Sequence, residues 1–524
     1  MQVASAAEMR RIDHRTITVY HVPGIVLMEN AGLQLMHFLQ EHMSELTKRH
    51  VTIVTGRGNN GGDGFILARH LWHRGVQTCV LMLTARRQLR GDTRRACEMA
   101  RAYGVPMVHC ATTATWRRAS SVLRHTDIVV DAILGTGLNK APTGLYAEAI
   151  DTLNTLGKPI VAVDIPSGLS ADDGQGPGVY IQATHTVTFA LPKRGLLLPP
   201  AAAAVGTLHV VDIGIPALAV AAEDIQVTLL EAAHIRLGLP QRHLDAHKGS
   251  HGHVLVVAGS HGKTGAGVLT SQAALRAGAG LVTWAMPTSL AHTMASNTVE
   301  VMLLPVPDSI NLGSMTPAAL PTLTQFLTRT HALVLGPGLG TAPETVACVR
   351  ALLPHVRVPM VIDADGLNCL LGALELLAEC PAPVILTPHP GEMARLLGTD
   401  TTTVQQQRLD IACAFAQQYG VYVVLKGAYT VIYAPDGRRW INPTGNPAMA
   451  TAGTGDVLAG VVGAMLGQGL TPLQAAQCGV YVHGLAGDRV RHRLGVRGLI
   501  ASDILVELPY ALQAIAKEAV CSLA

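Results

Sequence analysis

Short apolar runs alternate with longer segments of helical periodicity through the first half of the chain. The runs are rich in Val, Ile and Leu and predict buried strands at residues 51–54, 78–83, 105–109, 127–134 and 159–164. Two amphipathic helices, at residues 5–20 and 24–48, are predicted before them. Because strands that alternate with helices usually pair in parallel, the pattern predicts an α/β domain with a mostly parallel sheet, ending in an edge strand at residues 206–213.

A second series of the same kind follows a weakly patterned segment at residues 216–228. The strands predicted in this series lie at residues 254–258, 281–285, 332–335, 360–362, 384–386 and 421–425. Domain boundaries fall in segments without a strong pattern. We therefore expect two α/β domains, residues 1–217 and residues 226–520.

Composition narrows the class of protein. The 524 residues are 49% hydrophobic and 14% charged, so the chain can bury two large cores. A formal net charge of +3 lacks the basic excess of a nucleic-acid binder, and no charge-free apolar run reaches the roughly 18 residues of a membrane span. The first turns are charged, which argues against a signal peptide. Nine scattered cysteines without a C-x-x-C pair argue against disulfides or structural zinc and indicate a reducing, cytoplasmic compartment.

Polar loops follow three strands of the first half. Residues 58–64 read Gly-Asn-Asn-Gly-Gly-Asp-Gly and precede a helix predicted to begin at Phe65, while the other two loops start at Asp131 and Asp164. Strand, glycine loop and helix are typical of a Rossmann-like opening, although the two asparagines depart from a pyrophosphate-binding spacing. Each acid alone could be a cap or turn residue. Since ligands bind at the carboxyl ends of parallel strands, their convergence favours a binding site.

A glycine-rich turn in the second half opens directly into an apolar helix. Gly453, Thr454, Gly455 and Asp456 occupy the junction. Backbone amides at a helix N-terminus bind phosphate oxygens, and a carboxylate in the first turn can remove a proton from an attacking hydroxyl. The junction therefore suggests phosphoryl transfer, with a capped and tightly packed helix start as the equally simple alternative.

The three loops of the first half resemble those of NAD(P)H-hydrate epimerases, a family that inverts the C6 carbinol of hydrated nicotinamide cofactors. The resemblance implies that the hydroxyl leaves and returns through an iminium, with Asp164 as the acid/base. It also implies a potassium ion held by Asn60, Asp127 and Ser167. The residues implied to contact the hydrated cofactor are Asn59, Asn60, Gly61, Gly62, Asp63, Asp131, Ala132, Ile133, Leu134, Gly135, Thr136, Gly137 and Asp164.

The second half resembles NAD(P)H-hydrate dehydratases, which have a ribokinase-like α/β fold. The resemblance rests on the loops at residues 336–340, 363–368, 387–392 and 426–430 together with the helix start at 453–456. It covers essentially the whole chain, which therefore resembles the bifunctional NAD(P)H-hydrate repair enzymes. The implied nucleotide contacts are Lys426, Gly427, Ala428, Tyr429, Thr430 and Gly455. The implied contacts of the hydrated cofactor are Ala266, Gly338, His389 and Asp456.

The implied dehydration begins with phosphoryl transfer. Hydroxide is a poor leaving group, so phosphorylation of the C6 oxygen, with Asp456 as the base, allows the ring nitrogen to expel phosphate. A magnesium ion would bridge the nucleotide phosphates. Bacterial relatives dehydrate the S form with ADP, giving AMP, whereas eukaryotic relatives favour ATP, and the sequence itself does not decide the donor.

Several alternatives stay open at this level. A ribokinase-like small-molecule kinase fused to a nucleotide-binding Rossmann-like module would share the Gly453–Asp456 junction, and a scaffold role for the first half would leave Asp164 dispensable. His261, Lys263 and Thr264 stand where many relatives carry a bulky residue, so the contacts of this turn are open, and His389 between two prolines could be structural. We expect hydrated NADH or NADPH and ADP as ligands, no nucleic-acid or membrane partner, and a homo-oligomer, although cofactor preference, channelling and oligomeric state leave no direct trace in the sequence.

Overall fold

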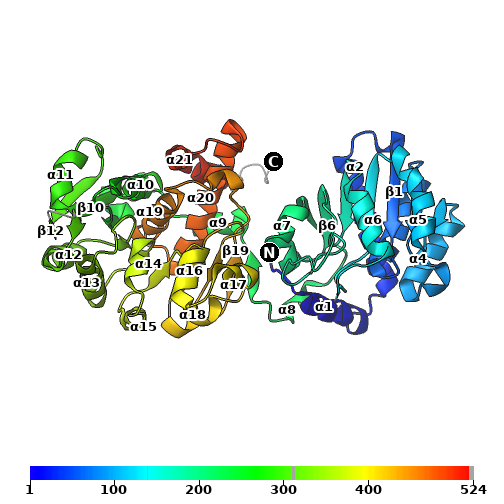
Figure 1. Cartoon of the computed structure of the whole chain (residues 1–524), viewed down its shortest axis with the longest axis horizontal. Coiled ribbons are helices and arrows are strands. Elements are labelled where there is room, and N and C mark those ends of the chain that lie inside the picture. Colours follow the sequence, from blue (N-terminus) through cyan, green and yellow to red (C-terminus); the bar gives the residue numbers. More distant parts are fainter. Residues whose placement is uncertain (139, 310–312, 518–524) are drawn as a thin grey trace. The chain divides into compact units, whose positions relative to one another are not determined.

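The computed structural model of the protein describes residues 1–138, 140–309 and 313–517. Residues 518–520, at the end of the predicted second domain, and Cys521 lie outside the described residues. The chain divides into two compact units, Met1–Ile225 and Gln226–Ala524 (Figure 1). Each unit has its own sheet and its own apolar cores, as expected of independent α/β domains.

The first unit is built on a seven-stranded sheet in which every neighbouring pair is parallel. In spatial order the strands are β3 (Met107–His109), β2 (Gln77–Met82), β1 (His50–Thr55), β4 (Ile128–Ala132), β5 (Ile160–Val163), β6 (His185–Phe189) and β7 (Thr207–Val211). Strand β6 was not predicted, because Thr186 and Thr188 make it look polar. Both threonines are buried, and their hydroxyls donate to the Val205 carbonyl and to the Asp164 carboxylate.

Eight α-helices accompany this sheet in the described residues. They are α1 (Ala6–Thr18), α2 (Gly24–His42), α3 (Asn59–His73), α4 (Gly91–Ala102), α5 (Thr113–Ala119), α6 (Leu145–Asn154), α7 (Ala201–Ala204) and α8 (Ala217–Ala221). Helix α3 begins at Asn59, six residues before the predicted start at Phe65. A methyl group at Gly61 would lie 2.3 Å from the Gly56 carbonyl oxygen, and one at Gly64 would lie 2.7 Å from Ala132 Cβ. These glycines therefore lie inside the helix and allow it to pack closely against its neighbours. They do not form a loop.

The second unit is built on a ten-stranded sheet that is parallel except around β18, which is antiparallel to both neighbours. In spatial order the strands are β11 (Met302–Val306), β10 (Leu281–Pro287), β9 (His253–Val257), β14 (Ala332–Leu335), β15 (Met360–Ile362), β16 (Val384–Leu386), β17 (Tyr422–Leu425), β18 (Val431–Tyr433), β19 (Arg439–Ile441) and β8 (Val227–Leu229). A two-stranded sheet joins β12 (Asp308–Ser309) to β13 (Ser314–Met315).

The helices of the second unit follow its strands along the chain. They are α9 (Ala232–Gly238), α10 (Thr264–Arg276), α11 (Thr288–Met294), α12 (Leu320–Leu327), α13 (Pro343–Leu352), α14 (Asp365–Cys369), α15 (Glu375–Glu379), α16 (Pro390–Leu397), α17 (Thr401–Gln406), α18 (Cys413–Tyr419), α19 (Thr454–Gly467), α20 (Pro472–Leu494) and α21 (Ala501–Lys517). The α/β fold class with two parallel-sheet units agrees with the prediction from the sequence.

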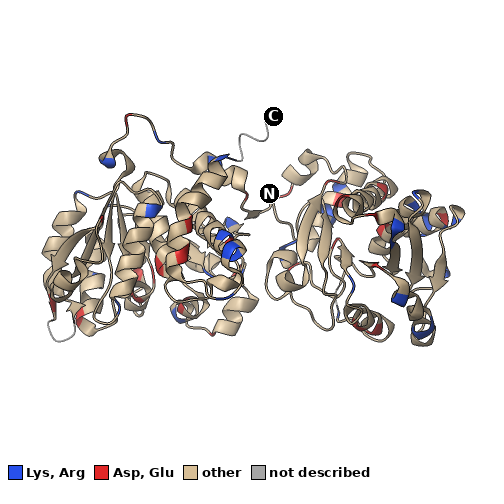
Figure 2. Ribbon diagram, turned by 90° about the horizontal axis from the view of Figure 1, so that it is seen from above, with Lys and Arg blue, Asp and Glu red and all other residues tan. Residues whose placement is uncertain are grey.

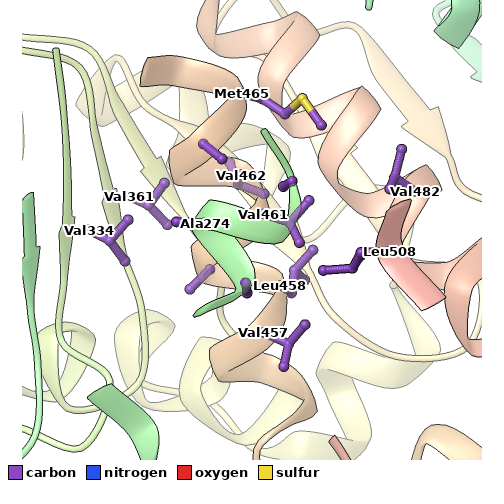
Figure 3. Packing of buried hydrophobic residues seen from close by; sticks show 14 of the residues in the cluster. Ala274, Val334, Val361, Val457, Leu458, Val461, Val462, Met465, Val482 and Leu508 are labelled. Atoms are coloured by element: carbon purple, nitrogen blue, oxygen red, sulfur yellow. The ribbon is translucent and has the colours of Figure 1, made fainter. Parts of the chain in front are cut away.

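Helix α19 lies at the centre of the second core (Figure 3). Its residues from Val457 to Gly467 are all buried, so the helix is apolar on every side, as a central helix must be. Side chains from α10, α20, α21, β14 and β15 surround it. A methyl group at Gly463 would lie 2.2 Å from Val334 Cγ2, so the sheet can approach only because position 463 has no side chain. This packing fixes the start of α19 at the sheet edge.

The charged side chains and the cysteines are distributed over both units. Basic and acidic side chains are interspersed along the helices of both units (Figure 2). Eight of the cysteines lie in the described part of the chain, and all eight are free thiols. No helix among the described residues is long and apolar enough to cross a membrane.

Candidate active sites

A cavity of about 1190 Å³ opens at the carboxyl edge of the first sheet. It is large enough for a nucleotide-sized ligand. The predicted contact residues that line it are Asn59, Asn60, Asp63, Ile133, Leu134, Gly135, Thr136, Gly137 and Asp164. Gly61, Gly62, Asp131 and Ala132 are buried behind this lining, so they support the cavity wall instead of forming it.

Asp164 follows β5 and is ion-paired with a lysine that the sequence did not reveal. Lys193 Nζ lies 2.5 Å from Asp164 Oδ1, and the side chain of Lys193 is only 2% exposed. The Thr188 hydroxyl and the Phe189 amide also donate to Asp164 Oδ1, at 3.0 and 3.2 Å. Asp164 has a φ of 63°, a left-handed conformation that is uncommon for a residue other than glycine. Three donors thus hold this carboxylate at the cavity.

Asp13, Asp63 and Asp92 also line the cavity, and the first two interact electrostatically with Asp164. Asp13 belongs to α1 and Asp63 to α3. Burial raises the pKa of Asp13 to about 6, with Lys193 opposing and Asp164 adding to the shift. Burial, reinforced by the negative charges of Asp164 and Asp13, raises the pKa of Asp63 well above its usual value. The charge of Lys193 thus opposes the rise in the pKa of both Asp13 and Asp63.

Asn60, Asp131 and Ser167 form a buried polar cluster beneath the cavity. Ser167 Oγ donates to Asp131 Oδ1 at 2.5 Å and accepts from the Leu134 amide at 2.8 Å, while Asn60 Nδ2 donates to the Leu134 carbonyl at 2.9 Å. Burial raises the pKa of Asp131 to about 6, although its hydrogen bonds with Ser167 oppose the shift. The cluster brings together the oxygen atoms of a side-chain amide, a carboxylate, a hydroxyl and a backbone carbonyl.

The position of Asp127 requires a correction. It precedes β4, so it lies at the amino end of the strand, and its carboxylate accepts a hydrogen bond from the His50 amide at 2.9 Å. Asn60 and Ser167 lie at the opposite edge, beyond the carboxyl ends of the parallel strands. The length of β4 therefore separates Asp127 from its two predicted partners, and Asp131 is the carboxylate that lies beside Ser167.

The second unit also places a lysine among carboxylates at its sheet edge. Lys426 follows β17, and its Nζ lies 2.6 Å from Asp363 Oδ1 and 3.8 Å from Glu392 Oε2. Burial acts to lower the pKa of Lys426, but these two carboxylates outweigh it and raise the pKa. A methyl group at Gly455 would lie 3.4 Å from Lys426 Nζ, which brings the start of α19 against the lysine.

Within the described part of the chain, no hydrogen bond or ion pair involves the carboxyl group of Asp456. It lies in the first turn of α19, where burial and the neighbouring Asp363 raise its pKa to about 7, with Lys426 opposing the shift. A carboxyl group with a pKa near neutrality can accept and return a proton at physiological pH. The geometry therefore permits Asp456 to act as the predicted base.

The backbone from Lys426 to Thr430 is held from below by a buried arginine. Arg408 Nη2 donates to the carbonyls of Leu425 and Lys426, at 2.9 and 2.8 Å. Gly427 has a φ of 132°, and a methyl group there would lie 3.0 Å from the arginine. The left-handed φ of Tyr429, 51°, marks a second sharp turn. Arg408 was missed by the sequence analysis because nothing in the local pattern distinguishes it from a surface arginine.

The remaining predicted contacts lie around a neighbouring turn. A methyl group at Gly338 would lie 2.9 Å from Ala266 Cβ, so these two positions lie side by side. Their contact with the hydrated cofactor stays a prediction. Lys263 Nζ crosses to Asp365 Oδ2 at 2.9 Å, and Asp365 also accepts from the Gly340 amide. Lys263 thus closes one side of this turn with an ion pair.

His389 has a clear structural role. Its Nδ1 accepts from the amides of Gly391 and Glu392, at 3.0 and 3.3 Å, and thereby caps α16. Burial lowers its pKa, although Glu392 opposes the shift. Its side chain stays half exposed, so a contact with substrate remains a prediction alongside this capping role.

Comparison with known proteins decides the family. The chain is 46% identical over 519 residues to the bifunctional NAD(P)H-hydrate repair enzyme of Moorella thermoacetica, which covers 99% of this chain and 98% of the relative. The chain belongs to the bifunctional NAD(P)H-hydrate repair enzymes. The relative of the same name in Escherichia coli is 37% identical over 463 residues, covering 88% of this chain and 84% of that protein.

Separate family models match the two units. The model for NAD(P)H-hydrate dehydratase matches residues 254–510, and the model for the YjeF-related protein N-terminus matches residues 24–195. Among solved structures, the ADP/ATP-dependent NAD(P)H-hydrate dehydratase of Bacillus subtilis, co-crystallised with ATP and Mg²⁺, is 29% identical, with a TM-score of 0.48, and the match covers 56% of this chain and 99% of that one. Membership of the NAD(P)H-hydrate repair family confirms the predicted pair of epimerase and dehydratase activities.

Proposed function

We propose that the two units of this repair enzyme divide the reaction. The first unit interconverts the R and S forms of hydrated NADH and NADPH, and the second dehydrates the S form with ADP, giving AMP and phosphate. The observation that best supports this division is that each sheet edge carries its own lysine among carboxylates. These are Lys193, which is buried, and Lys426, which is partly buried. Two complete sets of proton-carrying groups are what two separate reactions at C6 require.

In the first unit Asp164 acts as the acid/base at the C6 hydroxyl. Its ion pair with Lys193 and its two further donors orient the carboxylate without a contribution from substrate. The loop residues Asn59 and Gly135 to Gly137 surround the nicotinamide ring. Arg10, Arg57 and Arg90 also line the cavity and can bind the pyrophosphate of the cofactor.

A potassium ion would be held by Asn60, Asp131 and Ser167. The amide, the carboxylate, the hydroxyl and the Leu134 carbonyl supply the hard oxygen atoms that an alkali cation takes. The residues present therefore fit the ion, with Asp131 in place of Asp127. When bound, potassium supplies positive charge beneath the loops that Leu134 and Ser167 belong to.

In the second unit the nucleotide contacts Lys426, Gly427, Ala428, Tyr429 and Thr430. The amide of Gly455, at the start of α19, faces its transferred phosphoryl group, since backbone amides at a helix N-terminus attract phosphate. Asp456 takes the proton of the C6 hydroxyl as the phosphoryl group arrives, and the ring nitrogen then expels phosphate.

The hydrated cofactor would lie over Ala266 and Gly338, with His389 at its edge. Magnesium would neutralise charge on the phosphates of ADP. Among the described residues no group of three His, Cys, Asp or Glu side chains is placed to hold a metal by itself, which fits an ion bound mainly by nucleotide phosphates.

The deciding experiment follows recovery of the dihydronicotinamide absorbance when the full chain is incubated with mixed R and S hydrated NADPH and ADP. We expect complete recovery, with one phosphate released for each cofactor repaired. A ribokinase-like kinase of the sugar or hydroxymethylpyrimidine type would instead accumulate a stable phosphorylated product. Replacing ADP by ATP in a parallel incubation identifies the donor.

Location and assembly remain predictions. We place the protein in the cytoplasm, because its cysteines are scattered without a C-x-x-C pair. We also expect a homo-oligomer, which size-exclusion chromatography with light scattering tests directly.

A further inference from the structure

Inversion at C6 requires proton transfer on both faces of the ring, which one carboxyl group cannot provide. The R and S hydrates differ in which face of the dihydropyridine ring carries the hydroxyl. To convert one into the other, the C6–O bond breaks on one face as the oxygen gains a proton, and a water molecule adds to the iminium carbon on the other face as it loses a proton. Atoms and charge balance without an oxidant or reductant. Each face therefore needs a group that can carry a proton.

The wall of the cavity formed by α1 carries such a group. Met9, Asp13 and Ile17 all line the cavity, and their spacing of four residues places them on one face of the helix. Asp164 reaches the cavity from the end of β5, at the sheet edge. The two carboxyl groups thus approach the same space from different elements.

Asp13 has no structural task that explains its place. Among the described residues, no side chain or backbone amide forms a hydrogen bond or ion pair with its carboxyl group, although it is partly buried. A carboxyl group withdrawn from water without a partner costs free energy, and such groups are common where chemistry occurs. Asp92, by contrast, lines the same cavity but is ion-paired with Arg95.

We propose that Asp13 is a second catalytic residue of the epimerisation, which exchanges a proton with water on the ring face that Asp164 does not reach. The proposal rests on the proposed role of Asp164 in the first unit. Asp164 and Asp13 exchange roles with the direction of reaction: one protonates the leaving hydroxyl as a carboxylic acid, and the other removes a proton from the entering water as a carboxylate.

The surrounding charges suit this exchange. The groups that face Asp13 are Lys193, Asp164 and Asp63, and burial holds the pKa of Asp13 at about 6 against the attraction of Lys193. Near neutral pH both forms of Asp13 are then populated. Burial and the negative charges of Asp164 and Asp13 raise the pKa of Asp63 well above its usual value. Asp63 is buried, whereas Asp13 is partly exposed to the cavity, and this distinguishes the two carboxyl groups.

The test measures two events separately: breaking of the C6–O bond, and inversion at C6. The full chain, without ADP, is incubated with each purified epimer of hydrated NADPH in ¹⁸O-labelled water, and both ¹⁸O uptake and the opposite epimer are measured after subtraction of the protein-free rate. In the parent, we expect uptake and inversion to proceed together from either epimer. With Asp13→Asn, inversion should fall roughly 10²-fold or more. One epimer should still exchange its oxygen, since Asp164 can release and return water on its own face.

Two variants serve as controls. Asp13→Glu keeps a carboxyl group on α1, so uptake and inversion should remain coupled even if both are slower. Asp151→Asn removes a charge from an exposed position of the same unit and should behave as the parent. If Asp13→Asn inverts at the parental rate, or if it loses uptake and inversion equally for both epimers, the proposal is overturned. Undiminished inversion by Asp164→Asn would instead overturn the role of Asp164, and the two failures are distinguishable.

Discussion

The two candidate active sites share one plan, in which a buried or partly buried lysine lies among carboxylates at the carboxyl edge of a parallel sheet. They differ in which carboxylate the lysine binds. In the first unit Lys193 pairs directly with Asp164, the proposed acid/base. In the second unit Lys426 pairs with Asp363, while the proposed base, Asp456, stands outside the pair and has its pKa raised to about 7.

This difference matches the two reactions. Phosphoryl transfer needs one base that takes a proton once, and a single unpaired carboxyl group of near-neutral pKa suffices. Inversion needs proton carriers on two faces of a ring, and the first unit has both an oriented, paired carboxylate and an unpaired one, Asp13, whose pKa lies near 6. A carboxylate that is paired with the lysine is thus held in a fixed orientation, whereas a carboxyl group outside the pair can exchange its proton more readily.

Separating the units gives the largest expected effect. Residues 1–225 expressed alone should interconvert the epimers without dehydrating either, and residues 226–524 should dehydrate only the S form. Each unit has its own core and its own site, so each reaction should be lost completely from one fragment. Chromatography of the epimers and absorbance of the dihydronicotinamide measure both reactions. If both fragments fold and either one carries out both reactions, the division of labour is wrong.

Asp456→Asn should lower dehydration roughly 10²- to 10⁴-fold, because it removes the base and keeps its shape. Nucleotide binding, measured by calorimetry, should be retained since Lys426 and Asp363 are unchanged. Epimerisation in the same sample is the internal control. Turnover within a few-fold of the parent would exclude Asp456 as the base.

Asp164→Asn should confine repair to one epimer. With mixed hydrates and ADP, the S form should disappear at the parental rate, while the R form declines only at its slow spontaneous rate of epimerisation. Losing one partner of a buried ion pair costs about 3–5 kcal/mol, so circular dichroism must first establish that the variant is folded. Rapid loss of the R form in a folded variant would assign the proton transfer to another group.

Removing potassium should affect the first site alone. Exchange of K⁺ for tetramethylammonium at equal ionic strength should lower epimerisation roughly tenfold, the lower end of the effect of losing a partner around a bound metal. Dehydration of pure S hydrate should not change. Asp131→Asn should abolish the dependence on potassium, whereas Asp127→Asn should leave it intact, and the reverse result would restore Asp127 as a ligand.

The smallest expected effect is a pH-dependent gain in stability for Asp456→Asn. The folded pKa of Asp456, about 7, exceeds the ordinary value of 3.8 for an aspartate, so its contribution to stability is fully present below pH 4 and is lost as the pH rises through 7. Asparagine has no such loss. The variant should therefore unfold about 2–4 °C higher than the parent at pH 8, by calorimetry, and at the same temperature near pH 4. An equal difference at both pH values would contradict this explanation.

The sequence predicted most strands of the two large sheets, because these strands are continuous apolar runs. It did not predict β8, β11, β18 and β19 of the second sheet. It failed where polar side chains are buried in strands, as with Thr186 and Thr188 of β6, and where glycines serve packing rather than a loop, as at Gly61 in α3. The glycine loops and the acids at strand ends predicted both candidate sites. Asp127 was placed with Asn60 and Ser167 by the family resemblance, but it precedes β4, four residues before Asp131, and lies at the opposite end of that strand.

The partners of the site acids were invisible in the sequence for a physical reason. Lys193 lies 29 residues from Asp164 along the chain, and lysines are rarely buried, so no local pattern identifies it. Arg408 is anchored to carbonyls 17 and 18 residues away. Asp13 looks like any acid of an amphipathic helix. Such contacts depend on tertiary structure alone.

The anchoring of α1 also sets the order in which the protein can become active during synthesis. The helix is among the first segments made, but the Ala6 amide binds Asp172 and Glu8 binds Arg194, up to 186 residues later in the chain. At about 5–20 residues per second, these partners leave the ribosome roughly 10–40 s after the helix does. Until then the helix has no place to dock and the cavity lacks a wall. The first catalytic centre is therefore completed only near the end of translation of its own unit.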